Sequence, residues 1–306
     1  MKKVLFSSIL SLLFTITQAQ TVNTDVVTDN PKIDNWLSVN LDLFDMEVPG
    51  SSLEAAIQNV SFNIGTWGHV EVPKLPVGLQ YSYRQSWFVL GAIGNKNMPK
   101  HSDIQLGAYF FLSDKTKTKS LKVGLKTSSK QTATTRTTTD TYINMDGQQR
   151  NQFGVRAGLI NKRSGLSLDP ENPTPSNIET TKHSSTGLYA GIINRKTTNL
   201  VVNTDRYGLA STASKASNIY VDAIIGFTNS FEDIDNNNAD VTDEIKTHLG
   251  GFPIGARIGY QVYQVEKRSV TGKMFGLSTR GELGYRPFYG PYLSASVGIT
   301  LIKAQR

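Results

Sequence analysis

Apolar and polar residues alternate along much of the chain. Between Leu37 and Leu43 the apolar residues take every second position, and Ser38, Asn40 and Asp42 stand between them. The same alternation recurs in the segments 75–84, 104–112, 121–126, 219–228 and 293–301. Successive side chains of a strand point to opposite faces, so this period of two predicts strands with one apolar and one polar face.

The pattern predicts about fourteen strands, with an uncertainty of about two either way. The candidate strands are 36–46, 57–67, 75–84, 86–94, 103–113, 118–128, 130–145, 151–163, 184–197, 199–210, 217–229, 251–266, 273–285 and 290–303. A short helix is expected over Ser51–Asn59, with Ser52 as its N-cap. Elsewhere glycine, threonine, asparagine and serine are too frequent for helices.

A weak internal repeat places pairs of glycines four residues apart. Phe153–Ser164 reads FGVRAGLINKRS, Thr186–Thr197 reads TGLYAGIINRKT, and Ile254–Tyr260 keeps only the core as IGARIGY. In a strand both glycines of a pair lie on one face. There they relieve crowding or leave room for large neighbouring side chains.

The strands of a soluble sandwich or propeller would also alternate apolar and polar residues, but three features favour a membrane barrel. The apolar face runs over five positions in several segments, about the height of a lipid-facing band. Aromatic residues gather at segment ends, as at Trp36 and Trp87, and long polar connections such as Leu166–Thr186 and Ser230–Gly250 alternate with short turns. We therefore expect an all-β fold, an antiparallel transmembrane β-barrel of about 12–14 strands with long polar outer loops.

The N-terminus has the layout of a secretory signal peptide. Lys2 and Lys3 precede the short apolar stretch Val4–Ile16, and Thr17 and Ala19 supply small residues for cleavage after Ala19. A membrane anchor is disfavoured because a spanning helix needs about 20 apolar residues. The predicted organisation is a signal peptide at 1–19, an N-terminal tail at 20–35 and a barrel at 36–306 in a Gram-negative outer membrane.

Composition excludes several classes of protein. The chain has no cysteine, which excludes disulfides and thiolate metal sites. Its 32 basic residues fall to 30 without Lys2 and Lys3, against 25 acidic ones, and so mild an excess does not indicate a nucleic-acid partner. There is no Walker loop or dinucleotide fingerprint, so no cofactor is expected.

If lipid faces the apolar residues, charged residues of the polar face line the barrel lumen. The candidate lumen residues are Lys122, Lys126, Arg156, Arg195, Arg257, Arg280, Asp222 and Glu282. A basic lumen would favour passage of anions. The alternative is that these charges pair across the barrel as structural filling, without an open pore.

Two polar segments are candidates for ligand or surface contacts. Asp233, Asp235, Asn237 and Glu244 have the spacing of a calcium loop, but Asn238 stands where the loop needs glycine, so a solvated acidic loop is favoured. Thr127–Thr141 is rich in threonine and basic. It predicts either a hairpin arm beyond the membrane or a disordered loop, and its positive charge suits contact with lipopolysaccharide.

Catalysis has little support in the sequence. The four histidines His69, His101, His183 and His248 lack metal-ligand spacing, and Ser184 beside His183 is on no nucleophile turn. We expect no enzyme activity, with a barrel hydrolase as the weakest alternative.

The chain resembles the outer-membrane β-barrel proteins of Bacteroidota. The resemblance rests on the Gln18-Ala19-Gln20 ending of the signal, the asparagine-rich loops and the glycine-spaced strands, and the chain lacks the usual terminal aromatic residue, ending instead in 302–306. The resemblance implies partners among outer-membrane lipid, lipopolysaccharide and a protein of an envelope complex. Two functions remain open: a pore for small polar solutes, or a non-conducting accessory or plug subunit of a machine such as the type IX secretion translocon.

Overall fold

The computed structural model describes residues 23–32, 37–49, 60–72, 75–89, 101–132, 135–168, 179–206, 208–210, 214–233, 252–265 and 275–301. The predicted signal peptide, the predicted helix and Asp235 to Glu244 lie outside these ranges. The described residues form thirteen strands. Among the described residues there is no helix that is long and apolar enough to cross a membrane.

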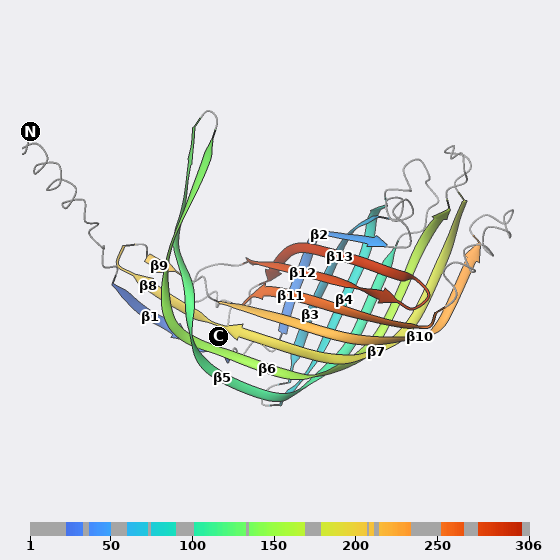
Figure 1. Ribbon diagram of the computed structural model, residues 1–306, viewed down its shortest axis with the longest axis horizontal. Helices are drawn as coiled ribbons and strands as arrows, with labels where there is room; N and C mark the ends of the chain where they lie inside the picture. Colours follow the sequence, from blue (N-terminus) through green and yellow to red (C-terminus); the bar gives the residue numbers. More distant parts are fainter. Residues whose placement is uncertain are drawn as a thin grey trace, which may run out of the picture.

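Ten of the strands close into a barrel (Figure 1). Its order is β10 (Lys215–Asp233), β11 (Ile254–Gln264), β12 (Phe275–Arg286), β13 (Gly290–Leu301), β2 (Leu37–Pro49), β3 (Ser61–Glu71), β4 (Val77–Val89), β5 (Ser102–Gln131), β6 (Arg136–Leu168) and β7 (Glu179–Thr198), which pairs again with β10. Every neighbouring pair is antiparallel. The predicted all-β fold with a closed antiparallel barrel is confirmed.

The barrel has fewer strands than the 12–14 expected, because several candidates belong to one strand. β4 joins 75–84 to 86–94, β5 joins 103–113 to 118–128, and β6 joins 130–145 to 151–163. The polar residues between these candidates remain paired across β5 and β6, since backbone hydrogen bonds do not depend on side-chain polarity. The candidate 199–210 forms β8 (Leu200–Thr204) and β9 (Gly208–Ala210), which lie outside the barrel.

The barrel is apolar outside and polar inside. Large apolar side chains are exposed on all ten strands, among them Ile64 on β3, Leu188 on β7 and Leu293 on β13. The buried side chains of the same strands are mostly polar or charged, and serine and arginine are the most frequent among them. This reverses the distribution of a soluble protein, whose charged residues are almost never buried unless they are paired.

Glycines of the repeat make room for tyrosines inside the barrel. A Cβ added at Gly259 would lie 2.1 Å from Cζ of Tyr220, and one at Gly158 would lie 2.6 Å from the Tyr189 hydroxyl. Both tyrosines are buried. These two glycines therefore leave space for large inward side chains on neighbouring strands, which is one of the two roles expected from the repeat.

Strands β5 and β6 extend beyond the barrel as a two-stranded arm, defined as residues 113–131 and 136–148 (Figure 1). β4 pairs with β5 only as far as Phe110, whereas β5 and β6 stay paired from Ser102 to Gln131. Of the two interpretations of Thr127–Thr141, the hairpin arm is the one observed.

A three-stranded sheet packs against this arm. It has the order β1–β8–β9, where β1 (Thr24–Asp29) comes from the predicted N-terminal tail. Leu200 and Val202 of β8 form an apolar cluster with Leu121 and Val123 of β5. The arm is thus held in place by tertiary packing.

The two ends of the barrel differ. One end carries the connections at 50–60, 90–101, 169–178 and 234–253 and the short turn at 287–289. The other end carries the arm, the three-stranded sheet, the start of β2 and the end of β13 (Figure 1). The arm therefore lies opposite the long connections.

Candidate functional site

The barrel interior is the candidate functional site, because it holds a large set of buried charges. Within the described residues, ion pairs join seven basic and seven acidic interior side chains. The bases are Arg84, Arg156, Lys162, Arg195, Arg257, Arg280 and Arg286, and the acids are Asp42, Asp45, Glu47, Glu71, Asp103, Asp222 and Glu282. All are buried except Glu71, which is partly exposed.

Arg84 of β4 contacts acids on three other strands. Its Nη2 lies 2.8 Å from Oε2 of Glu282 and 3.2 Å from Oδ2 of Asp103, and its Nη1 lies 3.8 Å from both Asp45 and Glu47. These acids come from β12, β5 and β2. One guanidinium group therefore links walls of the barrel that are far apart in sequence.

Arg257 of β11 is the second arginine that contacts side chains of several other strands. Its Nε donates to Oδ2 of Asp222 at 2.7 Å, and its Nη1 donates to Gln105 at 2.7 Å and to Glu282 at 3.2 Å. The hydroxyl of Tyr220 also donates to Glu282, at 2.6 Å. Glu282 thereby connects the contacts of Arg84 and Arg257 into one network.

The network continues towards both ends of the barrel. Towards the long connections, Arg286 donates to Glu47 at 2.8 Å and to Asp103 at 3.0 Å, and Lys162 pairs with Glu47. Towards the arm, Arg280 pairs with Asp42 and Asp45. These ion pairs run without a break from Lys162 through Glu47, Arg84 and Asp45 to Arg280.

Near the arm end, Arg195 of β7 pairs with Glu71 and donates to Asn218 at 2.9 Å. Its guanidinium lies over the rings of Tyr109 and Phe111, 4.9 and 5.1 Å from their centroids. Such stacking offsets part of the cost of burying the charge. The barrel is therefore also filled close to this end.

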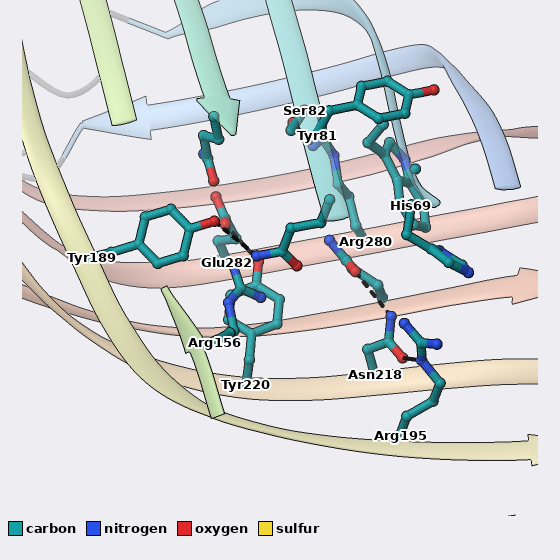
Figure 2. A pocket seen from close by; sticks show the side chains of 15 residues that line it. His69, Tyr81, Ser82, Arg156, Tyr189, Arg195, Asn218, Tyr220, Arg280 and Glu282 are labelled. Carbon is teal, nitrogen blue, oxygen red and sulfur yellow. Dashed lines mark hydrogen bonds between the residues drawn. The ribbon is translucent and has the colours of Figure 1, made fainter. Parts of the chain in front are cut away.

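A small polar cavity lies beside the network (Figure 2). The guanidinium of Arg156 stands over Tyr220, 3.9 Å from the ring centroid, and the Gln80 amide is 2.8 Å from the Tyr189 hydroxyl. The cavity leaves about 20 Å³ open to the centre of a water molecule. That volume suits about one or two waters, since a single water needs about 10–15 Å³ of such space.

Six of the eight predicted lumen residues lie in this interior. Arg156, Arg195, Arg257, Arg280, Asp222 and Glu282 are all buried members of the network. Lys122 and Lys126 lie instead on the arm, where both are exposed and Lys122 stands 3.6 Å from the ring centroid of Tyr142. Their expected place in the lumen is corrected, because β5 continues past the end of the barrel.

The excess of interior bases expected from the sequence is also not observed among the described residues. A bulge in β2 explains much of the difference: Leu43 is 63% exposed and the adjacent Phe44 is 48% exposed, so both face outward. The shift turns Asp45 and Glu47 inward, where simple alternation from Leu37 would point them outward.

The histidines and acids of the described interior are also candidates for metal binding. The described residues contain no group of three histidine, aspartate or glutamate side chains able to hold a metal ion. His183 bonds Asn229 through Nε2 at 2.7 Å, and His69 lies 3.4 Å from the Tyr263 hydroxyl. Of the predicted calcium ligands, Asp233 ends β10, and Asp235, Asn237 and Glu244 lie outside the described residues.

Comparison with known proteins adds no family assignment. No protein-family model matches the chain, and no curated protein is significantly similar to it in sequence.

Proposed function

We propose that this chain is an integral outer-membrane β-barrel that does not conduct solutes and serves as a scaffold in the cell envelope. The observation that carries the proposal is the balance of charge inside the barrel. Seven bases meet seven acids in contacts that cross from wall to wall. An aqueous pore would leave such groups hydrated and apart.

The outer surface supports membrane insertion. Exposed large apolar side chains surround the barrel on all ten strands, and a soluble monomer rarely exposes a continuous apolar patch above a few hundred Å². Lipid is the solvent in which such a surface is stable, and a closed barrel leaves no unpaired strand edge inside it.

The strand number supports a filled interior. Barrels of about 8 strands are just wide enough for side chains to fill, whereas barrels of about 16–18 strands leave an aqueous channel. Ten strands place this barrel near the filled end of that range. The pore for small polar solutes, and its preference for anions, is therefore the less favoured function.

Loop length orients the barrel in the proposal. Outer-membrane barrels have short periplasmic turns and long outer loops. The connections at 90–101 and 234–253 would face the outside, and the arm would face the periplasm. Lipopolysaccharide would then meet the long connections, and the arm would be free to meet a periplasmic partner.

Planar-bilayer recording of the purified protein tests the proposal. We expect the current to stay at the level of the empty bilayer at all moderate voltages, while protection from added protease confirms that the barrel has inserted. Stepwise openings of uniform size from the inserted protein would contradict a sealed scaffold and would favour the function as a pore for small polar solutes.

A further inference from the structure

The charge around the small polar cavity is unbalanced, although the described interior as a whole has as many paired bases as acids. Among the described residues that line the cavity, those with a full charge are Arg156, Arg195, Arg280 and Glu282 (Figure 2). Glu282 is already bound by two bases outside the lining, since its Oε2 accepts from Arg84 at 2.8 Å and its Oε1 accepts from Arg257 at 3.2 Å. Positive charge therefore prevails at the cavity wall.

The guanidinium group of Arg156 is incompletely satisfied. Its Nε pairs with Oδ1 of Asp222 at 3.2 Å, but this carboxylate also pairs with Arg257 at 2.7 Å. The Tyr189 and Tyr220 rings stabilise the charge of Arg156, with centroids 5.0 and 3.9 Å from its Cζ, but they do not accept its in-plane N–H groups. Nη1 of Arg156 is buried and has no hydrogen-bond partner among the described residues. A buried charged donor is costly unless an acceptor meets it.

The cavity limits the size of such an acceptor. It leaves about 20 Å³ for the centres of water-sized particles, which is space for about one or two of them. A phosphate, a small organic acid or a peptide is too large for this space. A monatomic ion fits, since chloride is only slightly larger than a water molecule.

Charge selects an anion over a cation or a water molecule. The three lining arginines repel a cation, and a water could accept from Arg156 but would leave the positive charge uncompensated. A halide ion does both, and charge-assisted hydrogen bonds are roughly twice as strong as neutral ones. The amides of Gln80, Asn218 and Gln261 also line the cavity, and an amide can direct its NH₂ group towards an anion.

We propose that this cavity binds one small monovalent anion of the chloride class, with Nη1 of Arg156 as its main donor. The ion compensates the positive charge of the cavity wall and stabilises the folded barrel, because it binds the folded state only. The site goes beyond the scaffold function and does not depend on it, since it is built entirely from side chains inside the barrel.

Equilibrium dialysis against bromide tests the site, with the full-length protein folded from urea in non-ionic detergent while bromide is present. Sodium gluconate keeps the ionic strength constant, and gluconate is too large for the cavity. Elemental analysis of bromine on both sides of the membrane gives the bromide bound per chain. The bromine K-edge absorption spectrum then shows whether the bound ion has exchanged its water shell for protein donors.

Three variants locate the bound ion. Arg156→Gln removes the proposed main donor. Arg286→Gln is the matched control, because Arg286 is an equally buried base of the network that does not line the cavity. Lys115→Gln, Lys117→Gln and Lys119→Gln, made together, remove exposed positive charge from the arm.

We expect about one bromide per chain in the wild type, in Arg286→Gln and in the arm variant, in line with the size of the cavity. Arg156→Gln should bind bromide about tenfold more weakly. Bromide should also raise the thermal unfolding midpoint relative to gluconate in every protein except Arg156→Gln.

Three results would overturn the site. Absence of saturable bromide binding by the wild type would leave the cavity to water. Unchanged binding by Arg156→Gln, or loss of binding in the arm variant alone, would place the ion elsewhere. A fully hydrated bromide spectrum would do the same, and this measurement on the wild type decides the question even if Arg156→Gln does not fold.

Discussion

Arg257 and Asp222 form an ion pair that is fully excluded from solvent, with Nε of Arg257 2.7 Å from Oδ2 of Asp222. Asp222 also pairs with Arg156 at 3.2 Å. The pair belongs to neighbouring strands, β10 and β11, which are in register at these two residues. Burying two ions is costly, so each depends on the other remaining charged.

Removal of one member of this pair should strongly destabilise the barrel. In Asp222→Asn, Arg156 loses its described ion pair and Arg257 keeps only Glu282 as an acidic partner, and the expected loss of unfolding free energy is about 3–5 kcal/mol. Urea unfolding in detergent, followed by the gel shift between folded and unfolded barrel, measures it. Asp114→Asn is the matched control, because Asp114 lies exposed on the arm and its pair with Arg150 is of the surface kind, which contributes only about 0.2–1 kcal/mol. Equal losses in both variants would refute the buried network as a source of stability.

Substitution of the inward repeat glycine Gly259 by alanine should destabilise the barrel. Gly259→Ala places a methyl group 2.1 Å from the Tyr220 ring, which is enclosed by the network, and should cost about 1–3 kcal/mol of unfolding free energy. Gly281→Ala serves as the comparison, since its Cβ would meet only the Ser294 carbonyl at 3.5 Å. Thermal unfolding in detergent should give a clearly lower midpoint temperature for Gly259→Ala than for Gly281→Ala. The reverse order would contradict the packing described for Tyr220.

Opening the interior should create a channel of defined selectivity. Arg84→Ala with Arg286→Ala removes two large side chains and leaves five interior bases facing seven acids. The interior becomes wider and negative, so we expect openings in planar bilayers that favour cations. Measurement of the reversal potential in a salt gradient gives the sign. A double variant that inserts and remains silent would show that other side chains seal the barrel.

The contact between the arm and the three-stranded sheet should be a local stability element. Leu200→Ala removes a fully buried side chain from the cluster with Leu121 and Val123, at a cost of about 2–5 kcal/mol to that cluster. The cluster involves only the part of β5 beyond the residues that pair with β4. Proteolysis should therefore accelerate within the arm while the gel shift of the barrel stays unchanged. Val27→Ala, at an exposed position of β1, should leave proteolysis as it is in the wild type.

The period of two predicts the barrel because it reports which face of a strand meets an apolar environment. It also places Arg84 and Asp103 on inward faces, since each continues the polar side of its segment. Both could have been included among the interior residues from the sequence alone. The periodic segments thus carry most of the information about the fold.

The alternation of apolar and polar residues does not show which strands pair or where a strand has a bulge. The bulge at Leu43 and Phe44 reverses the faces of β2, so Asp45 and Glu47 become interior acids. The continuation of β5 past Phe111 depends on its pairing with β6, and it moves Lys122 and Lys126 out of the barrel. The charge balance of the interior follows from these two features, which is why the sequence predicts a basic lumen instead.

A barrel that is apolar outside and polar inside predicts opposite environments for two tryptophans. Trp87 of β4 is 65% exposed on the outer surface, whereas Trp67 of β3 is 2% exposed and donates to Asp42 inside the barrel at 3.0 Å. In a Trp36→Phe background, Trp67→Phe leaves only Trp87, and Trp87→Phe leaves only Trp67.

Quenching of these single tryptophans by lipids brominated close to the headgroup is the most direct test of the account. For protein reconstituted in such lipids, we predict strong quenching of Trp87 and fluorescence close to that in unbrominated lipid for Trp67. Equal quenching of the two, or protection of Trp87, would contradict a barrel that faces lipid with its apolar surface.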